Sequence, residues 1–142
     1  MTSGFSTPCE GDDALDRNPF VFIVDDESSM RDALSLTLET MGFSSKCFSS
    51  AIDFLEFIEQ SDTCNPVCLI ADTRMPRMSG VELLVQLEKM GKQFPVIMIS
   101  GHGTTTLKHR VKELGAIAFL EKPFRPPELQ VIISTLIEGN RG

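Results

Sequence analysis

Short apolar runs alternate with amphipathic stretches along most of the chain. The runs at residues 20–24, 67–71 and 96–99 contain no charged side chain, which predicts strands that are buried on both faces of a sheet. The half-polar run at 44–48 predicts an edge strand, and residues 116–120 predict a fifth strand. Because a helical pattern follows each run, the strands are expected to be parallel and joined by right-handed crossovers. The sequence therefore predicts the α/β fold class, as a three-layer sandwich of five parallel strands and five helices.

Capping residues mark the boundaries of the first three helices. The first helix is expected to be capped by Ser28 and to stop at Gly42, and the second is expected to begin at Ala51. Ser79 and Glu82 have the spacing of a capping box, in which each side chain bonds the backbone N–H of the other residue. A third helix is therefore predicted to begin there.

The last two helices differ in the regularity of their apolar pattern. The fourth is predicted by a thin apolar stripe on a mostly basic background, namely Leu107, Val111 and Leu114. Pro126 and Pro127 suit the first turn of the fifth helix, and Gly139 is expected to end it. The stripe of the fifth helix is the most regular in the chain and consists of Leu129, Ile132, Ile133, Leu136 and Ile137.

Length and charge narrow the class of protein. A chain of 142 residues fits one domain, which we place at residues 19–142, after a polar segment at 1–18 that is expected to be a flexible tail. The net charge of -7 argues against a nucleic-acid-binding surface, which is usually basic. The sequence contains neither a long apolar span nor a signal-peptide pattern, so the expected compartment is the cytoplasm and no membrane association is expected.

The four cysteines are expected to be reduced thiols. Cys47 and Cys68 fall in predicted strands, and Cys64 and Cys68 are separated by three residues rather than two. No histidine lies beside Cys9 or the other three, so a zinc site is the less favoured alternative.

Side chains that can carry chemistry follow four of the predicted strands. Asp25 and Asp26 follow the first strand, Asp72 the third and Ser100 the fourth, and Lys122 comes shortly after the fifth. In a parallel sheet these ends share one edge, where open α/β sheets place their ligands. Carboxylates gathered at this edge repel one another unless a cation neutralises them, and Mg²⁺ suits a few carboxylates combined with water and phosphate oxygens.

Asp72 is the candidate reactive group. A carboxylate can act as a covalent nucleophile, and Mg²⁺ and Lys122 would neutralise the charge of a moving phosphoryl group, so the set fits formation of an acyl phosphate on Asp72. Ser100 would donate its hydroxyl to a phosphoryl oxygen. A plainer interpretation stays open, because Asp25, Asp26 and Ser100 are also common turn residues.

Four segments together resemble the receiver domain of two-component response regulators: FVFIVDD at 20–26, LIADTRMP at 69–76, MISGHG at 98–103 and FLEKPF at 119–124. The resemblance covers nearly all of the chain after the tail. It is nearest to receivers of regulators that carry a helix-turn-helix output domain, including the nitrogen-fixation type. It implies a flavodoxin-like strand order, 2-1-3-4-5. It also implies a domain that accepts a phosphoryl group from a sensor histidine kinase and is not otherwise an enzyme.

The resemblance also implies roles for individual residues. Asp72 would be the phosphoacceptor. Asp26, Asp72 and the backbone carbonyl of Arg74 would hold Mg²⁺ directly, and Asp25 would act through water.

A second set of implied roles concerns switching. Ser100 would move toward a phosphoryl oxygen, and Phe119 would turn inward to fill the vacated space. Phe119 has a plainer interpretation as core packing, because aromatic residues are common in buried strands. The peptide bond between Lys122 and Pro123 is expected to be cis, as it is in the family.

Some positions depart from the residues usual in the family. Ala118 stands where receivers often carry an acidic residue, and Thr73 where an aliphatic residue is common. Residues 104–106 are three threonines in place of the usual acidic and apolar start of the fourth helix, and β-branched residues weaken local helix formation. We therefore hypothesise that the fourth helix and its surroundings are mobile in the unphosphorylated protein.

Two other protein classes compete with the receiver interpretation. A phosphatase of the haloacid dehalogenase type also combines an Asp nucleophile with Mg²⁺, but it needs a second Asp two residues later, where this chain has Arg74. A flavin or nucleotide binder would need a Gly- or Ser-rich loop after the first strand. This chain has Asp25 and Asp26 there, and both would repel phosphate.

Within the receiver interpretation, the output of the domain stays open. Subfamily resemblance favours the receiver part of a longer transcription regulator over a stand-alone receiver that acts by binding another protein. A homodimer through the fourth helix, fifth strand and fifth helix is compatible with the family. Direct contact of this domain with nucleic acid is not expected.

Overall fold

The computed structural model describes residues 19–60 and 65–141, with side chains up to residue 138. Within these residues, five parallel strands form one sheet in the order β2-β1-β3-β4-β5. Both the α/β class and the flavodoxin-like order are therefore confirmed. The strands are β1 (Phe20–Val24), β2 (Ser44–Phe48), β3 (Cys68–Asp72), β4 (Val96–Ser100) and β5 (Ala118–Glu121).

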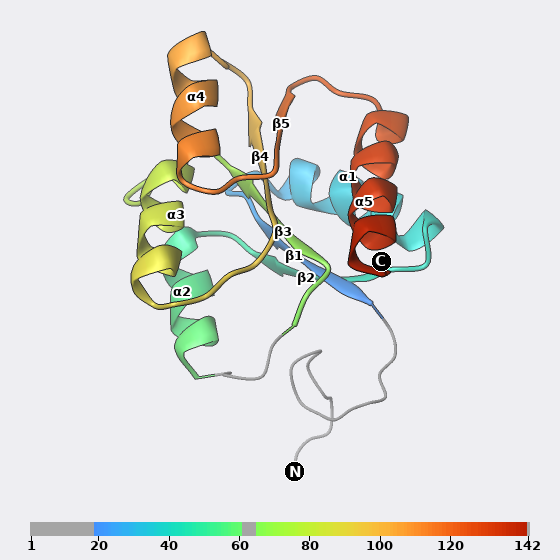
Figure 1. The fold of residues 1–142 in the computed structure, drawn as a ribbon, viewed down its shortest axis with the longest axis horizontal. Coiled ribbons are helices and arrows are strands. Elements are labelled where there is room, and N and C mark those ends of the chain that lie inside the picture. Colours follow the sequence, from blue (N-terminus) through green and yellow to red (C-terminus); the bar gives the residue numbers. More distant parts are fainter. Residues whose placement is uncertain (1–18, 61–64, 142) are drawn as a thin grey trace.

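Helices cover both faces of the sheet, as the three-layer prediction requires. Helices α2, α3 and α4 lie on one face, and α1 and α5 lie on the other (Figure 1). Each helix connects two neighbouring strands in chain order, except the last. The helices are α1 (Ser28–Thr40), α2 (Ala51–Glu59), α3 (Gly80–Lys89), α4 (Thr105–Glu113) and α5 (Pro126–Arg141).

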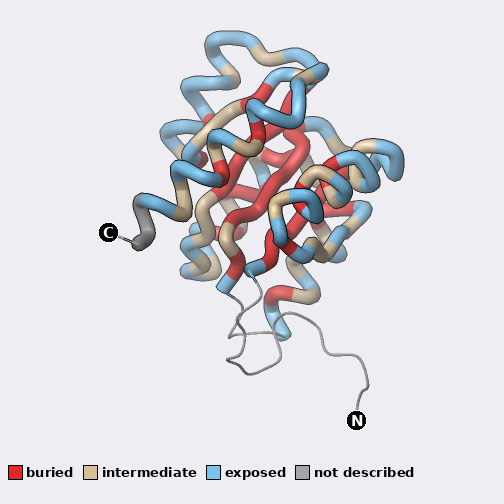
Figure 2. The backbone as a smooth tube through the Cα atoms, turned by 90° about the vertical axis from the view of Figure 1, so that its right-hand side faces the viewer, coloured by how far each residue is buried: buried red, intermediate tan, exposed pale blue. Residues whose placement is uncertain are grey.

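The strands are the most deeply buried part of the described chain, whereas each helix is buried along one side only (Figure 2). All residues of β1, β3 and β4 are buried, as expected for strands that are covered on both faces. Side chains from Phe22, Leu69 and Met98 pack under α2 and α3, and side chains from Ile23, Ile70 and Ile99 pack under α1 and α5. The sheet is thus a rigid base for the residues at its carboxyl edge.

The predicted boundaries of β3 and β5 are wrong by one or two residues at both ends: the strands are Cys68–Asp72 rather than 67–71, and Ala118–Glu121 rather than 116–120. β3 extends to Asp72 because this residue still pairs with Ile99 of β4. β5 begins at Ala118 rather than Ala116, because the N–H of Ala116 donates to the carbonyl of Val111 and so still belongs to the turn that ends α4. β2 has the predicted bounds and lies at the edge of the sheet, as predicted.

Two predicted helix boundaries are also wrong. Ser28 does not cap α1: the N-cap is Glu27, and its side chain makes no capping bond. The Asp25 side chain accepts the N–H of Glu27 instead, so Ser28 is the first helical residue. Gly139 does not end α5, which continues to Arg141, because glycine also adopts right-handed helical geometry.

The described residues also include the predicted capping box, the glycine after α1 and two of the cysteines. The capping box of Ser79 and Glu82 is present, and Gly42, at φ 88°, follows the end of α1. Cys47 and Cys68 are free thiols, and burial raises the pKa of Cys68 to about 12. The proposed tail at 1–18, with Cys9, and also Cys64 lie outside the described residues. No helix in the described part of the chain has the length and apolar character needed to cross a bilayer.

Candidate functional site

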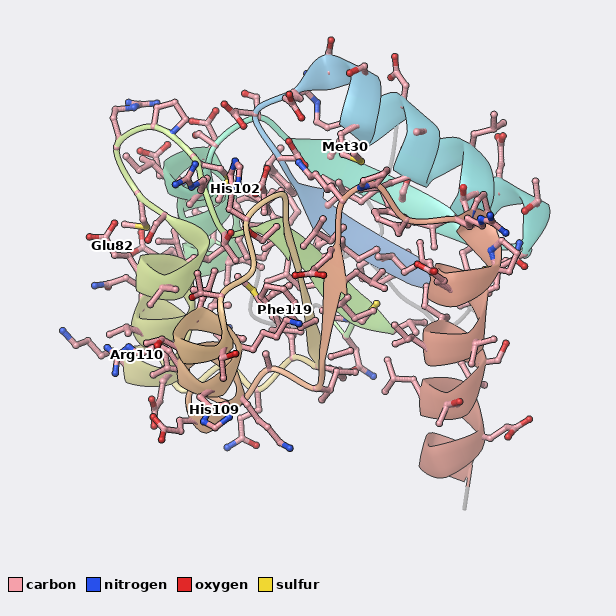
Figure 3. The ribbon with its side chains drawn as sticks, turned by 90° about the horizontal axis from the view of Figure 1, so that it is seen from above. Met30, Glu82, His102, His109, Arg110 and Phe119 are labelled. Atoms are coloured by element: carbon pink, nitrogen blue, oxygen red, sulfur yellow. The ribbon has the colours of Figure 1, made fainter. Side chains whose placement is uncertain are left out.

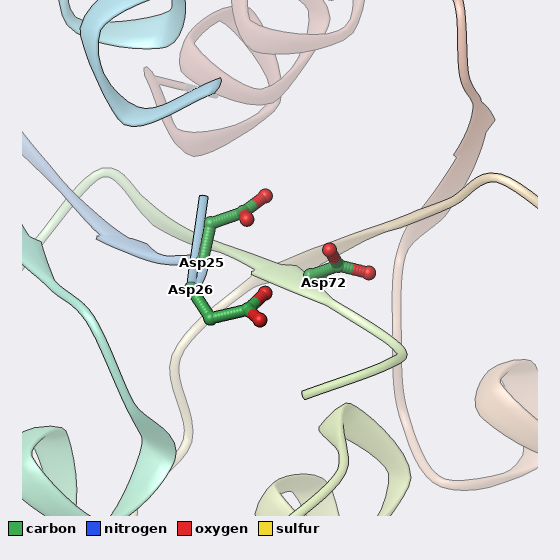
Figure 4. Close-up of side chains that lie close together, drawn as sticks. All are labelled: Asp25, Asp26 and Asp72. Atoms are coloured by element: carbon green, nitrogen blue, oxygen red, sulfur yellow. The ribbon is translucent and has the colours of Figure 1, made fainter. Parts of the chain in front are cut away.

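Three carboxylates meet at the carboxyl edge of the sheet. Asp25 and Asp26 directly follow β1, and Asp72 is the last residue of β3. One oxygen from each lies within 4.8 Å of the others, and the three side chains project from neighbouring strand ends toward a common space (Figure 4). Asp25 and Asp72 are buried, at 1% and 5% exposure, whereas Asp26 is exposed to solvent. The predicted convergence of these residues is therefore present.

Asp72 is held in place from two directions. The N–H of Arg74 donates to Asp72 Oδ1 at 3.0 Å, which fixes the orientation of the carboxylate. The start of α3 packs tightly against the end of β3: a Cβ on Gly80 would collide with the carbonyl oxygen of Asp72 and would lie 2.9 Å from the Cα of Thr73. Only glycine leaves room for this approach, so Gly80 helps to set the position of Asp72.

Asp25 is a buried acid with an unusual affinity for its proton. Its Oδ1 accepts the N–H of Glu27 at 2.9 Å, and its carbonyl oxygen accepts Arg31 Nη1 at 2.8 Å. The pKa of Asp25 is raised from 3.8 to about 6, mainly by burial and to a lesser extent by the nearby charge of Asp72, whereas the bond from the N–H of Glu27 and the charge of Lys122 lower it. The repulsion expected between the carboxylates is present, but desolvation is the larger cause.

Lys122 supplies the positive charge of this site. Its Nζ donates to Asp72 Oδ2 at 2.9 Å and lies 3.6 Å from Asp25 Oδ2. Burial lowers the pKa of Lys122, but the bond to Asp72 and the charges of Asp25 and Asp72 outweigh it, so the pKa is raised. The Lys122–Pro123 peptide bond is cis, as the resemblance implied.

Sequence reasoning missed Glu27 as a member of this site. Its Oε1 lies 3.3 Å from Lys122 Nζ, so the ammonium of Lys122 contacts three carboxylates at once. The side chain of Glu27 is largely exposed, at 60%, and such an ion pair contributes little to stability. The only signal for it in the sequence was its place next to Asp26.

Ser100 lies at the end of β4, in the same strand-end row. It is fully buried, and its Oγ accepts the N–H of His102 at 3.1 Å. The backbone carbonyl of Ser100 accepts the N–H of Lys122 at 2.8 Å, which connects the two strand ends. The side chain of His102 is exposed on the loop before α4 (Figure 3).

Phe119 lies in β5, on the side of the strand that faces α4 (Figure 3). Its ring packs against Gly103, where an added Cβ would lie 2.7 Å from Cε1, and Lys108 Nζ lies 5.7 Å from its centroid. The side chain is only partly buried in this position.

Thr73 carries an unsatisfied polar atom beside the site. It is 4% exposed, and its Oγ1 is the one buried side-chain oxygen or nitrogen without a hydrogen-bond partner among the described residues. The sequence indicated that Thr73 departs from the family's usual aliphatic residue, but not that its hydroxyl would be buried. This position is a local cost in stability.

The donor set fits a hard divalent cation. Three carboxylates of two neighbouring strand ends could supply oxygen ligands, and the β3–α3 loop begins directly after Asp72. Oxygen-only ligands without His or Cys favour Mg²⁺ over zinc. The arrangement combines a buried carboxylate, a group of oxygens that fits a cation and a lysine, and this set is chemically suited to phosphoryl transfer to an acid.

Comparison with known proteins agrees with this geometry. The model of the response regulator receiver domain family matches residues 21–134. The response regulator protein TodT of Pseudomonas putida is 43% identical over 114 residues, which are 80% of this chain and 49% of TodT. The transcriptional regulatory protein FixJ of Bradyrhizobium diazoefficiens is 34% identical over 117 residues, 82% of this chain and 56% of FixJ. The chain thus spans about half the length of these curated relatives.

Solved structures give the same result. The crystal structure of FixJ-N superposes with a TM-score of 0.71 at 39% identity, covering 86% of this chain and 92% of FixJ-N. The structure of the response regulator StyR gives a TM-score of 0.77 at 37% identity, over 88% of this chain and 62% of StyR. The family match extends over most of the chain and includes every residue of the acidic group. The chain therefore belongs to the response regulator receiver domain family.

Proposed function

We propose that Asp72 accepts a phosphoryl group from a phosphohistidine of a sensor histidine kinase. The observation that carries this proposal is the 2.9 Å contact between Lys122 Nζ and Asp72 Oδ2, made within reach of Asp25 and Asp26. A buried carboxylate that is paired with one lysine and surrounded by further acids gains little stability from this arrangement, which suits chemistry better than folding.

In the proposed reaction, an Asp72 oxygen attacks phosphorus. A P–O bond forms, the P–N bond to the donor imidazole breaks, and the electron pair of that bond leaves with the imidazole, which takes up a proton. Lys122 stabilises the negative charge on the phosphoryl oxygens. The buried hydroxyl of Ser100 would donate to one of these oxygens after the transfer.

Asp26, Asp72 and the carbonyl of Arg74 would hold Mg²⁺, and Asp25 would act through water. When bound, the ion neutralises the charge of the carboxylates and of the phosphoryl oxygens. Because burial already disfavours the charged form of Asp25, a cation here relieves an existing electrostatic cost.

The acyl phosphate would then act as a switch. Ser100 would move toward the phosphoryl group, and Phe119 would turn inward, which would alter the face formed by α4, β5 and α5. Dimerisation through this face is part of the proposal.

FixJ is a transcriptional regulatory protein, so we propose that the whole protein controls transcription. The net charge of -7 supports an indirect role for this domain, without contact to nucleic acid.

The proposal is tested by incubating the protein with acetyl phosphate and Mg²⁺ and measuring its intact mass. The parent protein should gain one phosphoryl group that is lost in mild base, and Asp72→Asn should gain none. Asp53→Asn is the matched control, because Asp53 is an exposed acid on α2, and it should behave as the parent. A gain of mass by Asp72→Asn equal to that of the parent would contradict the proposal.

A further inference from the structure

A cluster of three side chains, Lys108 of α4 with Phe119 and Glu121 of β5, lies between α4 and the last strand of the sheet. Lys108 Nζ is 5.7 Å from the centroid of the Phe119 ring and 3.6 Å from Glu121 Oε2. Phe119 and Glu121 are two residues apart on one strand, so they share a face of the sheet, and one ammonium group contacts both. We call this set the Lys108 cluster.

Gly103, in the loop before α4, packs against the ring of Phe119. A Cβ at this position would lie 2.7 Å from both Phe119 Cε1 and Glu121 Oε2. The loop before α4 therefore packs closely against the same two β5 side chains that Lys108 contacts. Gly103 and Lys108 therefore hold the Phe119 ring on the α4 side of β5, and Glu121 holds Lys108.

We infer that Lys108 is a positioning residue, which holds Phe119 in its α4-side position and so opposes the switch. This inference rests on the proposed function, in which Phe119 turns inward after phosphorylation of Asp72. That movement would separate the ring from the ammonium of Lys108. The cluster would thus favour the unphosphorylated arrangement by a contact that is made in one state only.

The size of the effect follows from the exposure of the cluster. The side chains of Lys108 and Glu121 are 46% and 51% exposed, so solvent screens both the ion pair and the cation–π contact. Contacts of this strength shift a two-state ratio by roughly fivefold. That is too little to lock the ring, but enough to set how readily it turns.

The experiment uses carbon-13 NMR of phenylalanine labelled at one ring carbon, which adds no atom to the tight contact with Gly103. The chain has ten phenylalanines, and the Phe119 signal is identified by its loss in Phe119→Leu. The chemical shift of the Phe119 signal is measured in the parent before and after treatment with acetyl phosphate and Mg²⁺. The straight line between these two shifts serves as a scale for the fraction of molecules in which the ring is turned inward. Lys108→Met should move the signal of the untreated protein along this line toward the phosphorylated end, with a roughly fivefold higher inward-to-outward ratio.

Two variants and a second readout separate positioning from a local effect of charge. Lys108→Arg keeps the cation and should restore the parent signal, and Lys112→Met removes an exposed lysine from the same helix and should leave the signal unchanged. Lys108→Met should also accelerate phosphorylation by acetyl phosphate, because it raises the population of the inward arrangement, which is the one that accepts the phosphoryl group in the proposed switch. Loss of a positive charge alone would slow phosphorylation, because acetyl phosphate is an anion and would be attracted less strongly. A faster rate therefore indicates positioning, and a slower rate indicates an effect of charge.

The outcomes distinguish this inference from the proposed function. Absence of phosphorylation on Asp72 in the parent would contradict the proposed function, and phosphorylation without movement of the Phe119 signal would contradict its switch. If the parent behaves as proposed while Lys108→Met matches Lys112→Met in signal and in rate, the positioning role of Lys108 is overturned. A displacement of the signal away from the calibration line, without faster phosphorylation, would also overturn it.

Discussion

The two ends of the proposed signalling route differ in how firmly they are held. Around Asp72, buried carboxylates are fixed by backbone N–H groups, by Lys122 and by the close packing of Gly80. Around Phe119, the contacts come from half-exposed charged side chains, and the ring itself is only partly buried. The comparison indicates that the chemical end is preorganised, whereas the responding end is only marginally stable in one arrangement. A switch needs a firmly held reactive group and a weakly held responding group, because phosphorylation supplies only a small free energy for moving the ring.

The largest expected effect concerns Lys122. Lys122→Ala removes the cation nearest to the phosphoryl oxygens, so phosphorylation by acetyl phosphate should slow by on the order of a hundredfold. Mg²⁺ affinity should not fall, because the carboxylates remain and a positive charge beside them is removed. The chain has no Trp or Tyr, so Mg²⁺ binding is measured by calorimetry rather than by intrinsic fluorescence. Lys112→Ala is the matched control, and equal losses of rate and of Mg²⁺ affinity would contradict the assigned role.

The buried acid Asp25 should make stability depend on pH. Its folded-state pKa of about 6 lies above the ordinary value of 3.8, so the folded protein binds the proton more tightly and loses stability as pH rises from about 4 through about 6. A rise of this size corresponds to about 3 kcal/mol. In EDTA, Asp25→Asn should therefore be more stable than the parent at about pH 8 and should lose this advantage near pH 4. Urea unfolding followed by circular dichroism measures the difference, and an advantage that is independent of pH would contradict the cause.

The packing that positions Asp72 is tested at Gly80. Gly80→Ala places a methyl group against the backbone of Asp72 and Thr73, so the free energy of unfolding should fall by about 2 kcal/mol and phosphorylation should slow. Gly101→Ala is the control, because nothing lies within 4 Å of a Cβ there. If both variants unfold at the same urea concentration, the close approach of α3 to β3 does not constrain the site.

A smaller effect is expected at Thr73. Thr73→Val replaces an unsatisfied buried hydroxyl with a methyl group of similar shape, so the protein should gain about 1 kcal/mol of stability. Thr106→Val, at an exposed position of α4, should change little. Destabilisation by Thr73→Val would instead indicate that the hydroxyl has a partner, such as a water molecule.

The smallest expected effect is a difference in amide hydrogen exchange between α4 and α5 of the parent protein. In α4 only Val111 is buried and the first turn begins with threonines, whereas α5 buries both Leu129 and Ile133. Amide hydrogens of α4 should therefore exchange faster than those of α5 in the unphosphorylated protein. Thr104 caps α4 by accepting the N–H of Leu107, so the helix is formed. The exchange experiment therefore compares how often the two helices open. Equally slow exchange in the two helices would contradict the contrast between the two ends.

Much of the fold and of the acidic group could be predicted from the sequence. Short strand patterns that alternate with amphipathic helices predict a parallel sheet, and a parallel sheet brings Asp25, Asp72 and Lys122 to one edge. The strand order came from the family resemblance, because periodicity does not indicate which strands are neighbours.

What the sequence did not predict depends on contacts between distant segments. The bond from the N–H of Glu27 to Asp25 replaces the expected cap by Ser28, and the need for glycine at position 80 arises only because α3 meets the end of β3. Likewise, Lys108 meets Phe119 only after α4 has packed beside β5. Local patterns determine elements, whereas these contacts depend on tertiary structure.

The central claim, that Asp72 is the phosphoacceptor, is tested most directly by locating the modification. The protein is treated with acetyl phosphate and Mg²⁺, reduced with borohydride, which converts an aspartyl phosphate to homoserine, and mapped by peptide mass spectrometry. The account predicts homoserine at position 72 and unmodified Asp25 and Asp26. Homoserine at another aspartate, with Asp72 intact, would contradict it.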